Sequence, residues 1–182
     1  MRSSAASDVY KRQILYCDSN WNNLDDIDSY GHDIETSWLL TEAAEALGDP
    51  EVIGKCREVA LELADASLKE GINPMGAMMY ERHKDKIRKD ASWWCQAETV
   101  VGCINAWQLT GEQSYLDSAV RTWNFIKSRM IDKEYGEWFR TVLEDGTPRY
   151  KEPKASMWNC PYHNSRMGFE IDTRLKLSLI HI

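Results

Sequence analysis

The clearest candidate for chemistry is a histidine at a predicted helix start with a carboxylate one turn away. His32 lies in the run SYGHDIE (29–35), where Gly31 allows a sharp entry and Glu35 follows on the same helical face. A carboxylate beside an imidazole orients the ring and raises its basicity. The same residues also fit a capping arrangement, in which Asp33 and Glu35 favour the helix N-terminus. The motif alone leaves both interpretations open.

A second candidate combines tandem tryptophans with a glutamate in the run SWWCQAE (92–98). Trp94 lies four residues before Glu98 and therefore on the same helical face. Flat aromatic rings stack against sugars, so Trp94 is a candidate substrate contact. Core packing is the alternative for tandem tryptophans, although a buried carboxylate on that face needs a partner or a ligand.

A third candidate is the run MWNCPYHNSR (157–166), in which His163 follows a proline-led helix start and repeats the placement of His32. Trp158 precedes it by five residues, and Arg166, one turn later, could bind a carboxylate or hydroxyl oxygens. His83 lies in a charged stretch and is expected to be solvated. The sequence has no H-E-x-x-H or comparable ligand spacing, no glycine-rich phosphate loop and no G-x-S-x-G elbow. We therefore expect neither a metal nor another cofactor.

Helices must position these residues. Helical patterns are predicted over 33–47, 51–69, 92–109 and 114–130, and a fifth begins near Tyr162. The first and third end at Gly48 and Gly111, which are typical C-cap glycines. Residues 135–142, followed by the turn signal EDG (144–146), predict a short β-hairpin or an extended loop.

The first two helix pairs are predicted to be copies of each other. Glu35 precedes Gly48 by 13 residues, and Glu98 precedes Gly111 by the same number, so a shift of 63 superimposes them. The first helix of each pair is apolar almost all round, whereas the second carries one apolar stripe. Inner and outer layers of a toroid explain this difference. The predicted fold class is all-α, as part of an (α/α)6 barrel with one short β-hairpin.

Composition narrows the class of protein. The chain has 182 residues, 43% of them hydrophobic, and a net charge of -7, which is typical of a globular protein and argues against a nucleic-acid partner. No apolar run approaches the roughly 20 residues that span a bilayer, and no secretory h-region is present, so a cytoplasmic protein is expected. The five cysteines form no C-x-x-C pair, and Cys95 and Cys103 are predicted to be buried thiols.

Both ends of the chain differ from the repeat. Residues 1–13 and 175–182 show no continuity with it and resemble translated adapter sequence. We therefore expect a non-native leader, one domain over 14–174 and a non-native tail, and we leave both ends out of the functional argument.

From Ile14 to Ile171 the chain resembles the disaccharide-acting branch of the N-acylglucosamine 2-epimerase family. The resemblance rests on the runs SYGHDIE (29–35), WWCQAE (93–98), GEWF (136–139) and CPYHNSR (160–166). It implies an (α/α)6 barrel, about half of which is present. It also implies a cofactor-independent reaction in which the reducing-end glucose of a β-1,4-linked disaccharide, such as cellobiose or lactose, becomes mannose through ring opening and an enediolate.

The resemblance also implies roles for individual residues. His32 and His163 would be the acid–base pair, assisted by Glu35 and Glu98, and the sugar contacts would be Trp94, Trp158 and Arg166. Asn159 stands where the family pattern has lysine. Further active-site residues would come from an N-terminal half of the same barrel, so this chain alone is expected to be inactive or barely active. The full-length protein is expected to be a monomer.

Two alternatives remain at this point. A glycoside hydrolase on the same architecture would use Glu35 and Glu98 as paired carboxylates. A non-enzymatic helical-repeat scaffold would give His32, Glu35, Glu98 and His163 no reason to converge.

Overall fold

The computed structural model describes residues 12–159 and 161–180. All five predicted helical patterns are present as helices. The helices are α2 (Tyr30–Leu47), α3 (Pro50–Gly71), α4 (Trp93–Thr110), α5 (Gln113–Phe125) and α6 (Tyr162–Ile180). The fourth pattern is divided, because the chain widens after α5 into the π-helical turn η1 (Ile126–Met130).

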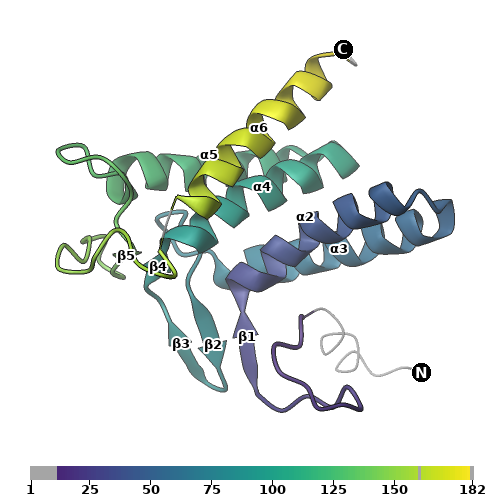
Figure 1. Cartoon of the computed structure of the whole chain (residues 1–182), viewed down its shortest axis with the longest axis horizontal. Coiled ribbons are helices and arrows are strands. Elements are labelled where there is room, and N and C mark those ends of the chain that lie inside the picture. Colours follow the sequence, from purple (N-terminus) through teal and green to yellow (C-terminus); the bar gives the residue numbers. More distant parts are fainter. Residues whose placement is uncertain (1–11, 160, 181–182) are drawn as a thin grey trace.

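The helices form two layers. Helices α2, α4 and α6 lie side by side, while α3 packs against α2 and α5 packs against α4 (Figure 1). Helix α4 is the most deeply buried, with an unbroken buried run from Trp93 to Ala106. Gly102 lets α2 approach α4 closely, since a Cβ there would lie 2.7 Å from Cγ1 of Ile34. The inner and outer layers predicted from the apolar patterns are confirmed.

The predicted 63-residue repeat is confirmed at the level of the helices. Both bounds of α4 lie 63 residues after those of α2. Each helix ends at a glycine in the left-handed region, Gly48 with φ 78° and Gly111 with φ 74°. The side chain of Asp49 then accepts hydrogen bonds from the first backbone N–H groups of α3, and Pro50 occupies the first helical position.

Two small antiparallel sheets lie beside the helix starts (Figure 1). Strands β1 (Ile27–Ser29), β2 (Glu81–His83) and β3 (Lys86–Arg88) form one sheet in that order. Strands β4 (Ala91–Ser92) and β5 (Thr141–Val142) form the other. The hairpin predicted from residues 135–142 and the following turn is confirmed, because Val142 bridges Pro148 and the Arg149 N–H donates to the Thr141 carbonyl at 2.9 Å. The turn at 144–146 is confirmed by a bond from the Leu143 N–H to the Thr147 carbonyl.

The chain ends are only partly within the described residues. Residues 1–11 of the expected leader lie outside them, whereas Arg12 and Gln13 contact the buried carboxylate of Asp33 at 2.7 and 2.8 Å. Residues 175–180 of the expected tail continue α6, and 181–182 lie outside. The non-native origin of both ends stays a prediction. No helix in the described part is long and apolar enough to cross a membrane.

Candidate active site

The predicted site residues gather where the inner helices begin. His32 and Glu35 lie in the first turns of α2, Trp94 and Glu98 in those of α4, and His163 and Arg166 in those of α6. An open pocket at this end is lined by five of the seven predicted residues: His32, Glu35, Trp94, Trp158 and His163. The other two, Glu98 and Arg166, lie behind the pocket wall and contact His163.

Glu98 is the centre of the polar network. Its carboxylate is 1% exposed and binds groups from the two other inner helices, α2 and α6. The Trp38 indole Nε1 donates to Oε2 at 2.9 Å, and Nδ1 of His163 lies 2.7 Å from Oε1. Arg166 Nη2 donates to the same Oε1 at 2.7 Å. The buried carboxylate therefore has the partners that its desolvation requires.

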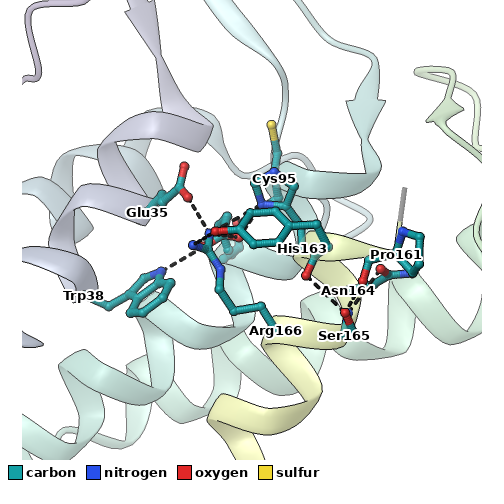
Figure 2. Close-up of polar contacts among 11 residues, drawn as sticks. Glu35, Trp38, Cys95, Pro161, His163, Asn164, Ser165 and Arg166 are labelled. Atoms are coloured by element: carbon teal, nitrogen blue, oxygen red, sulfur yellow. Dashed lines mark hydrogen bonds and ion pairs between the residues drawn. The ribbon is translucent and has the colours of Figure 1, made fainter. Parts of the chain in front are cut away.

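Arg166 joins the two glutamates. Its Nη2 donates to Glu35 (Figure 2). The same atom donates to Glu98, so one guanidinium is shared by carboxylates from α2 and α4. Burial acts to lower the pKa of Arg166, but its hydrogen bonds to Glu98 and Glu35 outweigh burial, and the net shift of this pKa is upward. Arg166 is therefore a fixed positive charge beside His163, whose Nδ1 lies 3.5 Å from Nη2.

His32 has a different partner from the one expected. Its Nδ1 lies 2.7 Å from the hydroxyl oxygen of Ser29, the residue before α2. Glu35, which was expected to orient this imidazole, is bonded to Arg166 instead. The i, i+3 spacing places His32 and Glu35 along the same pocket wall, but it does not pair them.

Trp94 lies close to both histidines. Its ring centroid lies 4.7 Å from that of His32 and 5.7 Å from that of His163. Gly31 makes this approach possible, because a Cβ there would lie 2.6 Å from Cη2 of Trp94 and 2.5 Å from Sγ of Cys95. The glycine is therefore required for close packing inside α2 rather than for the sharp entry that the sequence suggested. The two imidazoles and the indole form one wall of the pocket.

The segment before α6 supplies Trp158. This side chain lines the pocket but is 76% exposed, so its ring is available to a ligand. The neighbouring Asn159 is buried, and its amide donates to the Pro153 carbonyl at 3.2 Å. At this position, where the family pattern has lysine, the side chain therefore fixes the loop that carries Trp158.

Some residues of the site were not predicted. The sequence motifs gave no role to Trp38, which donates to Glu98, or to Ser29, which binds His32. Tyr80 also lines the pocket and meets Trp94 edge-on at 6.3 Å between ring centroids. Burial, and secondarily Cys95, raises the pKa of Tyr80, which keeps its hydroxyl protonated.

The donor atoms could in principle hold a metal ion. Oxygen and nitrogen atoms of Glu35, Glu98 and His163 lie within 4.8 Å of one another. Arg166, however, already supplies the positive charge between these two carboxylates. A cation would have to displace a guanidinium bonded to both, so this donor set fits an internal ion-pair network better than a metal site.

Comparison with known proteins shows the family of the chain. The model of the family described as N-acylglucosamine 2-epimerase (GlcNAc 2-epimerase) matches residues 12–164. The chain belongs to this family. A cellobiose 2-epimerase from Bacteroides fragilis is 42% identical over 159 residues, which cover 86% of this chain and 40% of that protein. One from Ruminococcus albus is 42% identical over 165 residues, covering 88% of this chain and 41% of its own length.

A solved structure supports the same assignment. The sugar epimerase from a ruminal bacterium superposes with a TM-score of 0.88 at 38% identity, covering 96% of this chain and 45% of that one. The helices are therefore part of an α/α barrel, as predicted. The chain spans about 40% of the length of the relatives from Bacteroides fragilis and Ruminococcus albus.

The glycoside hydrolase alternative is not favoured. A hydrolase needs two carboxylates that flank a glycosidic bond, about 5–5.5 Å apart in retaining enzymes and 6.5–9.5 Å apart in inverting ones. Here oxygens of Glu35 and Glu98 lie within 4.8 Å of each other and share Arg166. One guanidinium therefore bridges the two carboxylates. The scaffold alternative is not favoured either, because the four predicted polar residues converge.

Proposed function

We propose that this chain carries the proton-transfer residues of a carbohydrate 2-epimerase, and that the substrate is a β-1,4-linked disaccharide such as cellobiose or lactose. The observation that carries the proposal is the placement of His32 and His163 against the same indole, Trp94, at the wall of one pocket. The names of the relatives from Bacteroides fragilis and Ruminococcus albus support the choice of substrate.

The reaction starts from the open-chain aldehyde, whose carbonyl makes the C2 hydrogen acidic. One imidazole removes this proton and leaves an enediolate, and the other returns a proton to the opposite face of C2. Histidine suits both steps, because its ordinary pKa near 6.5 leaves the acid and base forms populated at neutral pH. No electron leaves or enters the sugar, so the chemistry is complete without an oxidant or reductant.

Glu98 prepares His163 for this role. A carboxylate only accepts hydrogen bonds, so Nδ1 of His163 carries the hydrogen that faces Oε1. Nε2 is then the nitrogen with the free lone pair in the neutral ring. The negative charge also stabilises the imidazolium that forms when Nε2 takes the C2 proton. Arg166 donates to the same Oε1 at 2.7 Å and so holds this carboxylate in place.

The substrate-binding roles stay proposals. Trp158, exposed at the pocket, would stack on a sugar ring, and Trp94 would pack against the reacting sugar between the histidines. Arg166 acts through Glu35 and Glu98 rather than through the sugar, because its Nη2 is already bonded to both. We propose that the rest of the pocket comes from the part of the barrel that the matched relatives possess beyond this segment.

The test is a chimeric enzyme in which residues 14–174 replace the matched segment of the Bacteroides fragilis protein. Incubated with cellobiose in deuterated water, it should place deuterium at C2 and form the epimer with mannose at its reducing end. His32→Ala and His163→Ala should each lower the rate on the order of 10² to 10⁴. His83→Ala is the matched control, because that histidine is exposed and lies outside the pocket.

Other outcomes would contradict the proposal. If His32→Ala or His163→Ala kept most of the activity, the acid–base assignment of that histidine would be wrong. Release of free glucose without the epimer would indicate a hydrolase. The 182-residue chain alone should show little or no turnover, and full turnover would refute the claim that its pocket is incomplete.

A further inference from the structure

The pocket holds a second group of polar side chains that the proton-transfer chemistry does not use. Trp93 Nε1 and Glu152 Oε2 are buried and have no hydrogen-bond partner among the described residues. Arg140 also lines the pocket and makes no ion pair within the described part of the chain. The two other arginines of the lining differ, since Arg88 binds Glu81 at 2.8 Å and Arg149 binds Glu152 at 3.2 Å.

The backbone holds Arg140 in a fixed place. Its carbonyl accepts a hydrogen bond from the Trp93 N–H at 3.0 Å, and the next residue, Thr141, pairs with Ser92 in the β4–β5 sheet. The guanidinium carbon lies 5.9 Å from the centroid of the Trp93 ring. The same ring lies 6.2 Å from that of His163. One indole therefore separates Arg140 from a proton-transfer histidine.

We infer that Arg140, Trp93 Nε1 and Glu152 form a subsite for the second sugar of the substrate, and that Arg140 selects disaccharides over monosaccharides. This inference rests on the proposed function. Each sugar hydroxyl both donates and accepts, so it can satisfy the donors of the arginine and the indole as well as the free carboxylate oxygen. The unpartnered groups are buried at a cost that a ligand would remove.

The charged side chains that line the pocket balance one another. Arg88, Arg140 and Arg149 line it together with Glu35, Asp90 and Glu152. Arg149 binds Glu152 at 3.2 Å, and Arg88 lies 3.7 Å from Asp90. These six side chains carry no net charge, which suits a neutral sugar better than a phosphorylated one.

The test measures sugar affinity in the 182-residue chain by following the tryptophan indole signals in NMR titrations with cellobiose, glucose and glucose phosphate. Arg140→Gln should weaken cellobiose binding about tenfold, as expected for loss of a charged hydrogen bond, and change glucose binding by less than about twofold. Arg140→Lys should fall between Arg140→Gln and the unsubstituted chain, because it keeps the charge but not the planar fork. Lys127→Gln is the matched control: it removes a similar cation–π contact, 5.8 Å from Trp123 on α5.

The outcomes separate selectivity from a structural role. Loss confined to cellobiose supports the subsite. An equal loss for cellobiose and glucose would mean that Arg140 only holds Trp93 in place, and it would overturn the inference. Unchanged affinity in Arg140→Gln, equal affinity for both sugars in the unsubstituted chain, or preferred binding of glucose phosphate would overturn it too. The proposed function has its own test, since C2 exchange in the chimera depends on His32 and His163.

Discussion

Replacing Glu98 by glutamine changes one atom and should disrupt the whole network. Oε2 of Glu98 accepts from Trp38, and Oε1 accepts from Arg166 and faces Nδ1 of His163. A glutamine has one acceptor oxygen, so its NH2 group must face either the indole N–H or the Arg166 side. The change also leaves a buried guanidinium with one carboxylate in place of two. Breaking a buried ion pair costs about 3–5 kcal/mol, and because Glu35 remains, we expect about 3 kcal/mol.

Urea unfolding of the 182-residue chain, followed by tryptophan fluorescence, measures this loss. With a urea slope of about 1–3 kcal/mol per molar, a loss of about 3 kcal/mol lowers the midpoint by about 1–3 M. Glu51→Gln is the matched control. It removes the same charge from an exposed glutamate paired with Lys55, and it should change the free energy of unfolding by about 0.5 kcal/mol or less. Equal midpoints for Glu98→Gln and the unsubstituted chain would refute the reasoning.

A second measurement isolates the effect on His163. In the unsubstituted chain, nitrogen NMR should find the neutral ring protonated at Nδ1, because that atom faces a carboxylate. In Glu98→Gln the amide group competes for this position, and the Nε2-protonated form should become populated. The chimera should then lose activity on the order of 10² to 10⁴. Lost stability with an unchanged tautomer would show that Glu98 holds the fold but does not set the proton on His163.

Two further outcomes test the packing. Gly31→Ala should lower the free energy of unfolding by about 1–3 kcal/mol in the same urea assay, because its Cβ would overlap Trp94 and Cys95, and an unchanged midpoint would contradict this close approach. Iodoacetamide at pH 8 should label Cys17, which is exposed, but neither Cys95 nor Cys103 in the folded chain, as mass spectrometry would report. Burial raises the pKa of the Cys103 thiol to about 12. The stability that the neutral thiol contributes is therefore complete below the ordinary thiol pKa, and it is lost as the pH rises from there toward 12.

The helical layers could be predicted because their signals are local. Gly48 and Gly111 end their helices through a left-handed conformation that favours glycine, and that preference is visible in a single sequence. The sheet β1–β2–β3 could not be predicted in the same way. Its strands are short and polar, the β2–β3 turn contains Lys84 at a φ of 54° instead of a glycine, and β1 lies more than 50 residues before β2. Pairing over that distance leaves no periodic signal.

Trp38 carries a signal that is present in the sequence but was not used in the prediction. It lies in an apolar run of an inner helix, so burial alone explained it. An indole N–H that is buried needs an acceptor, however, and the repeat already placed Glu98 at the depth of Glu35, one turn before Trp38. A buried donor and a buried acceptor at matching depths on adjacent inner helices predict the bond that the structure contains.

The polar partners of the site depend on which helices are neighbours. Glu35 is spaced to reach His32, yet its carboxylate binds Arg166, 131 residues away on α6. A guanidinium is always charged and donates in a planar fork, whereas an imidazole is neutral for much of the time at neutral pH. The partial burial of both side chains strengthens the attraction between full charges. The ion pair therefore forms at the expense of the local pair, and only the position of α6 beside the other inner helices decides it.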